Sequence, residues 1–125
     1  MTKDPHTEAQ KYSSEAALRS QLAIDLYAKA AALEKLALEG IEKNALRTRG
    51  ILSVSYASLL SKARMFAEAE FVINQCLSDP EMPEHARVQL RELKKVVDFE
   101  LIFNPHDPFA LKWDKEKRRR ILSDL

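Results

Sequence analysis

The chain has 125 residues, about the length of a single domain. It contains 46% apolar and 31% charged residues, a balance that excludes an intrinsically disordered chain, and its two glycines are too few for the many tight turns of an all-β protein. A formal net charge of +1 excludes a strong overall attraction to nucleic acid or to acidic surfaces.

The first predicted helix covers residues 8–43 and follows a polar tail, residues 1–7, that we expect to be mobile. Apolar residues recur along it every three or four positions, as on one side of a helix, at Leu22, Leu26, Ala30, Leu33, Ala37 and Ile41. A second apolar row widens this side and consists of Ile24, Tyr27, Ala31 and Leu38. We expect the widened side to pack against a neighbouring helix. The helix either ends near Gly40 and Asn44 or continues into the next segment.

The second and third predicted helices cover residues 45–63 and 66–77. Residues 67–71 alternate between apolar and charged, which is typical of a strand, but the longer segment has helical spacing. Its apolar positions are Ala69, Val72, Ile73, Cys76 and Leu77. The pattern continues for about twelve residues, which is long for a strand and ordinary for a helix. Because the link between the two helices is so short, we expect them to be antiparallel neighbours.

The fourth predicted helix follows Pro83, and one side of it carries Ala86, Leu90, Leu93, Val97 and Leu101. A further apolar row consists of Val96, Phe99 and Phe103. A fifth helix, with Asp107 as its cap, occupies the C-terminal segment 105–125 and either folds back over the fourth or docks on another chain. The sequence therefore predicts an all-α protein of about five helices in antiparallel hairpins, with residues 8–104 as its main domain.

Residues 50–80 resemble a tetratricopeptide repeat, a helix–turn–helix of about 34 residues. With Gly50 as the first position, the repeat's large, small and alanine sites are filled by Tyr56, Ala57, Leu60, Ala69, Ile73 and Cys76. Ser53 replaces the usual tryptophan, and Pro80 comes one place early. The spacing of Ala69, Ile73 and Cys76 in the second helix of the repeat also occurs in the first predicted helix, at Ala23, Tyr27 and Ala30.

The resemblance implies a right-handed superhelical stack with a concave face that holds a partner segment. The residues that would be exposed on this face are Ile51, Val54, Ser58, Ser61 and Lys62. Because such repeats cover their apolar faces by stacking on neighbours, the resemblance also implies self-association.

Signals for an enzyme are weak. The three histidines, His6, His85 and His106, have no metal-binding i, i+4 spacing, and the pair His106–Asp107 is better explained by a helix cap. The single cysteine, Cys76, lies on an apolar stripe and is expected to be buried, and no glycine-rich phosphate loop is present. We therefore expect no catalytic, metal or cofactor site.

The C-terminal segment contains a basic cluster, Lys117, Arg118, Arg119 and Arg120. With Trp113 just upstream, it could bind nucleic acid or an acidic partner. The alternative, which we favour, is the solvated end of a terminal helix. Phe109 and Trp113 are candidate anchors for a protein partner.

These patterns predict a non-enzymatic interaction module or adaptor that binds a protein segment through a helical groove and through Phe109 and Trp113. The alternative is a nucleic-acid-binding accessory protein. An N-terminus without an apolar run, the lack of a segment of about twenty apolar residues and the lone Cys76 predict a cytoplasmic protein outside the membrane.

Overall fold

The computed structural model describes residues 4–103, and its regular secondary structure there is entirely helical. The four helices are α1 (Pro5–Gly40), α2 (Leu46–Lys62), α3 (Phe66–Ser78) and α4 (Glu84–Phe103). The predicted all-α class is confirmed for these residues, and the alternating segment 67–71 is the start of a helix. The fifth predicted helix lies outside the described residues.

Helix α1 begins at Pro5, three residues earlier than expected, because Asp4 caps it. The Asp4 carboxylate accepts hydrogen bonds from the His6 backbone N–H at 3.3 Å and from the Thr7 hydroxyl at 3.0 Å. Residues 5–7, which were predicted to belong to the mobile tail, form the first helical turn instead. The helix ends at Gly40, so α1 and α2 are separate helices.

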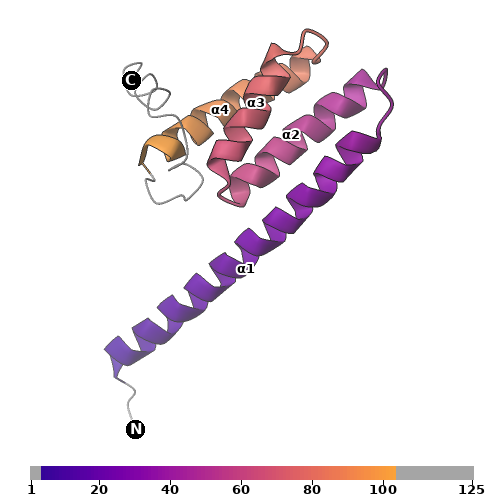
Figure 1. The fold of residues 1–125 in the computed structure, drawn as a ribbon. Coiled ribbons are helices and arrows are strands. Elements are labelled where there is room, and N and C mark those ends of the chain that lie inside the picture. The colour runs from indigo at the N-terminus through magenta and orange to yellow at the C-terminus, as the bar shows by residue number, and fades with distance from the viewer. Residues whose placement is uncertain (1–3, 104–125) are drawn as a thin grey trace.

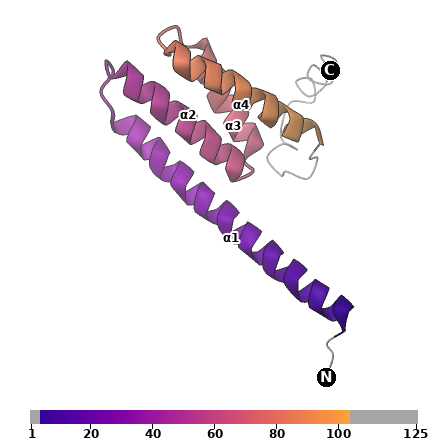
Figure 2. The same cartoon turned by 180° about the vertical axis from the view of Figure 1, so that it is seen from behind.

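Helix α2 lies at the centre of the molecule and contacts each of the other three helices, while α3 and α4 pack on each other (Figures 1 and 2). Helix α1 lies beside α2, which is its principal neighbour. Its 36 residues span about 54 Å at 1.5 Å per residue, whereas the 17 residues of α2 span about 26 Å. The N-terminal half of α1 therefore projects beyond the rest of the described chain.

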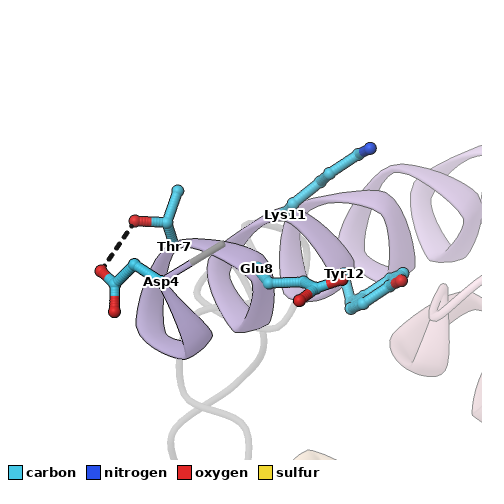
Figure 3. A pocket seen from close by; sticks show the side chains of 5 residues that line it. All are labelled: Asp4, Thr7, Glu8, Lys11 and Tyr12. Atoms are coloured by element: carbon cyan, nitrogen blue, oxygen red, sulfur yellow. Dashed lines mark hydrogen bonds between the residues drawn. The ribbon is translucent and has the colours of Figure 1, made fainter. Parts of the chain in front are cut away.

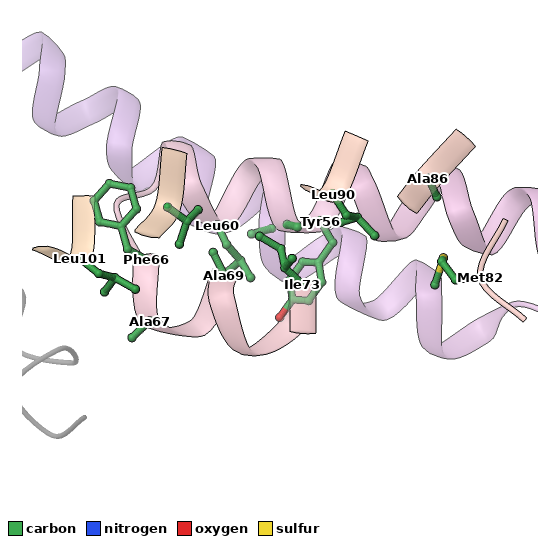
Figure 4. Close-up of a cluster of buried hydrophobic side chains, with 13 residues drawn as sticks. Tyr56, Leu60, Phe66, Ala67, Ala69, Ile73, Met82, Ala86, Leu90 and Leu101 are labelled. Carbon is green, nitrogen blue, oxygen red and sulfur yellow. The ribbon is translucent and has the colours of Figure 1, made fainter. Parts of the chain in front are cut away.

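Small residues bring the helices close together in the core (Figure 4). Ala57, Ala69 and Ala86 are fully buried, with Ile73 and Leu90 filling the space between them. The predicted stripes of α3 and α4 do face this core, because each of these helices has one dominant apolar side.

The turn between α2 and α3 closes with the two backbone hydrogen bonds of a Schellman motif. The Met65 N–H donates to the Leu60 carbonyl and the Arg64 N–H donates to the Ser61 carbonyl, each at 2.9 Å. Arg64 occupies the left-handed position with φ of 63°. These bonds use carbonyls that the end of α2 would otherwise leave without partners, and they fix the direction in which α3 begins.

Arginine side chains hold the connection between α3 and α4. Arg87 donates to the carbonyls of Met82 at 3.0 Å, of Leu77 at 2.9 Å and of Asp79. Asp79 also forms a 2.6 Å ion pair with Arg49 at the start of α2. The loop is thereby tied to all three helices of the core.

Candidate protein-interaction surface

Five leucines form an exposed apolar row along α1, which we call the leucine ridge: Leu18, Leu22, Leu26, Leu33 and Leu36. Each remains between 53% and 67% exposed. At 3.6 residues per turn the five positions fall within an arc of about 80°. They therefore form one continuous side of the helix rather than scattered surface residues.

The opposite side of α1 is the one that packs against α2. Ala31, which is 2% exposed, and the partly buried Leu38 lie about 160–180° around the helix from the ridge centre. Two contacts mark the edge of this interface: Ser55 of α2 donates a hydrogen bond to Glu34, and the Lys62 ammonium lies 5.7 Å from the Tyr27 ring centroid.

The expectation that Leu22, Leu26 and Leu33 pack inward is therefore wrong, and their row faces away from α2. The residues of the second row, Ala31 and Leu38 among them, make the contact instead. The physical reason is that α1 has apolar residues on two opposite sides, and within residues 4–103 its principal neighbour, α2, packs against only one of them. Three of the five ridge leucines belong to the predicted apolar row. Leu18 and Leu36 were missed, although Leu18 lies four residues before Leu22 and Leu36 three residues after Leu33.

Charged residues also occur on the ridge. Lys29 lies within its arc, between Leu26 and Leu33, and Asp25 lies at one edge. The Gln21 side chain donates a hydrogen bond to the Asp25 carboxylate at 3.1 Å. The surface thus presents an apolar row with one cation and one anion at fixed places.

A concave surface, separate from the leucine ridge, lies between α1 and α3, and residues of α2 form its floor. It consists of two adjacent cavities of about 320 and 210 Å³, which share Lys35, Tyr56 and Glu68. The Tyr56 hydroxyl donates to Glu68 at 3.3 Å. Burial, the negative charge and hydrogen bond of Glu68, and the more distant Glu39 raise the pKa of Tyr56 to about 12.

Cys76 lines the larger of these cavities and is half-buried rather than fully buried. Burial is the largest cause that raises its thiol pKa, against a hydrogen bond from Ser53 that lowers it. A thiol whose pKa is raised carries little thiolate near neutral pH and is a poor nucleophile.

The five residues predicted to be exposed on a partner-binding face all belong to α2. Ile51 is 52% exposed and Lys62 is exposed, whereas Val54, Ser58 and Ser61 are half-buried. None of the five lines the cavities between α1 and α3. The other predicted contact residues lie outside the described residues: Phe109, Trp113, Lys117, Arg118, Arg119 and Arg120.

A hollow of about 370 Å³ lies at the start of α1 (Figure 3). Its described lining, which includes Asp4, Glu8, Lys11 and Tyr12, comes from the beginning of this one helix. Asp4 serves there as the helix cap. Because residues 4–103 supply no opposing wall, we assign no site to this hollow.

Within residues 4–103, no group of three or more potential metal-ligating side chains comes together. No helix in the same part of the chain is long and apolar enough to span a membrane. No protein-family model matches the chain, and comparison with curated proteins and with solved structures finds no match either.

Proposed function

We propose that this protein is a non-enzymatic protein-interaction module of the cytoplasm whose main binding surface is the leucine ridge of α1. The observation that carries the proposal is the exposure of five aligned leucines, each more than half accessible, on the side of α1 that faces away from α2. Large apolar side chains exposed singly are ordinary on a protein surface, whereas a group of them aligned on one side of a helix usually marks an interaction site.

The scaffold in this proposal is tetratricopeptide-like in its middle. Two features support that interpretation: Ala57 and Ala69 have no exposed surface where α2 and α3 pack, and Gly50 lies where α2 approaches α4. Ile51 and Lys62 on α2, and Phe109 and Trp113 beyond the described residues, remain proposed secondary contacts. We assign no catalytic role to Cys76, since burial raises its thiol pKa.

Site-specific photo-cross-linking in cells tests the proposal. A photoreactive amino acid replaces Leu26 on the ridge, and the matched control places it at Val88, which is 50% exposed on α4. We expect several-fold more protein adduct from position 26 than from position 88. Equal yields at the two positions, or no adduct at position 26, would contradict an interaction surface on the ridge.

The alternative function, nucleic-acid binding through Lys117, Arg118, Arg119 and Arg120, receives no support from the described residues. It stays a prediction with a separate test. Reversing the charge of the three arginines should abolish binding to single-stranded RNA and its steep salt dependence if that alternative holds.

A further inference from the structure

We propose that the occupant of the leucine ridge is a second copy of this chain, whose α1 lies antiparallel to the first about a twofold axis near residue 27. This inference rests on the proposed function, because it names the partner that the ridge would bind. It makes the protein a homodimer held together by its longest helix.

The spacing of the leucines is self-complementary in this arrangement. In an antiparallel pair, the residue numbers of two positions that face each other add up to a constant value. For a twofold axis near residue 27 that value is about 54 or 55. Leu18 then faces Leu36 of the second copy, and Leu22 faces its Leu33. Leu26 packs on the aliphatic stem of Lys29 from the second copy, whose ammonium extends past it to solvent. Each leucine of the ridge thereby meets an apolar partner.

The charges of the ridge favour the same register. Lys29 faces Asp25 of the second copy, and the twofold axis generates this ion pair twice. In a parallel pair in register, Lys29 would face its own counterpart, and like charges at close range are repulsive. The antiparallel arrangement therefore pairs Lys29 with a carboxylate of the second copy, whereas the parallel arrangement would place two lysines side by side.

The rest of the described chain leaves room for this pairing. Helix α2, with α3 and α4 behind it, lies on the side of α1 opposite the ridge, so the two bodies sit on the outer sides of the helix pair (Figures 1 and 2). The exposed part of α1 that carries Leu18 and Leu22 is free to lie along the C-terminal half of the other α1.

The available area matches a weak but specific dimer. Each ridge leucine has about 80–100 Å² of apolar surface left to bury. The five leucines, with the Lys29 stem and neighbouring alanines, bring the total over two copies to about 1,000 Å². A specific interface needs at least about this much, and stable ones usually bury 1,200–2,000 Å².

Sedimentation equilibrium of the full chain over a dilution series tests the dimer. We expect a concentration-dependent dimer whose dissociation constant rises more than about tenfold in Leu22→Glu, because both copies lose a leucine of the ridge and each gains a carboxylate opposite Leu33 of the other copy. The matched control Val88→Glu changes a comparably exposed residue on α4 and should leave the dimer intact. A wild-type chain that is monomeric at every concentration overturns the inference, as does equal weakening in both variants. Circular dichroism checks that both variants fold.

Charge exchange and disulfide trapping test the register. Lys29→Asp and Asp25→Lys should each weaken the dimer, and the double variant should restore it. In a Cys76→Ala background, mixing Leu22→Cys with Leu33→Cys should give a disulfide-linked heterodimer. Failure of the double variant to restore the dimer, or self-linkage of Leu22→Cys alone, overturns the antiparallel arrangement.

Mass analysis of the cross-linked product at position 26 separates this inference from the proposed function. An adduct of two copies of the chain supports both. An adduct with a different protein overturns the second-copy inference and leaves the interaction module standing. The absence of any adduct, together with a monomer in solution, overturns both.

Discussion

Tyr56 is the residue at which the hydrophobic core and the α1–α3 cavity meet. The residue is 6% exposed and belongs to the core, and its hydroxyl donates a hydrogen bond to Glu68 at the cavity wall. The position demands a side chain that is apolar along most of its length and polar at its tip, which tyrosine supplies. Removing a proton from this hydroxyl would place a second negative charge beside Glu68.

The raised pKa of Tyr56 makes stability depend on pH in the alkaline range. Its pKa rises from 10.0 to about 12 in the folded protein. Above pH 10 the unfolded chain loses the proton while the folded chain keeps it, so the free energy of unfolding falls as pH rises. We expect the Tyr56 contribution to fall by about 1 kcal/mol between pH 9 and pH 11. Urea unfolding of wild type and Tyr56→Phe measures this, and the variant should show a correspondingly smaller fall.

The control is Tyr12→Phe, since Tyr12 is 61% exposed on the projecting part of α1. This variant should keep the wild-type pH dependence. If Tyr56→Phe loses stability between pH 9 and pH 11 as steeply as wild type, the role assigned to the Tyr56 hydroxyl is wrong.

At the scale of helices, the approach of α2 to α4 depends on Gly50. A Cβ atom added there would lie 3.2 Å from both the Ala86 Cβ and the Pro83 Cγ, and 3.3 Å from His85 Nε2. Such distances are tighter than ordinary packing. The lack of a side chain at Gly50 therefore sets how closely the two helices can lie.

Gly50→Val should destabilise the protein because its methyl groups force α2 and α4 apart. Overpacking of this kind typically costs about 1–3 kcal/mol, and we expect a loss in that range by urea unfolding. Gly40→Val is the matched control, because nothing lies within 4 Å of a Cβ at Gly40. Its effect should stay within about 0.5 kcal/mol. Similar losses in the two variants would argue against a close contact at Gly50.

At the scale of the whole molecule, the projecting part of α1 differs from the rest. Residues 9–20 are exposed throughout, whereas Ala31 farther along the same helix is buried. A helical segment without tertiary contacts is only marginally stable in water, since helices gain most of their stability from packing one apolar face. The two halves of α1 should therefore open independently.

Native-state hydrogen exchange should resolve this difference. We expect the amides of residues 9–13 to exchange at least about two orders of magnitude faster than those of residues 69–73 in the core. Residues 9–13 lie outside the segment that the proposed dimer would cover, so the result does not depend on self-association. Equal protection in the two segments would show that the N-terminal turns have a tertiary partner.

Helix positions could be predicted from the sequence to within a few residues. Helix-favouring composition, three- and four-residue apolar spacing and the prolines between segments are local signals, and local hydrogen bonding converts them directly into helices. Both ends of α1 differed by three residues, and its start lies earlier than predicted because the capping carboxylate of Asp4 acts just before the apolar pattern begins. The buried sides of α3 and α4 were also predictable, because each helix has one apolar side.

The candidate site was less predictable. The sequence placed Leu22, Leu26 and Leu33 of α1 in the core, whereas the folded chain exposes all three on the leucine ridge. Periodicity states which residues share a side of a helix, but not on which side the neighbouring helix lies. The sequence by itself therefore determined that the protein is helical and where its helices run. Only the tertiary structure decided which of the two apolar sides of α1 is buried, because α2 can cover just one of them.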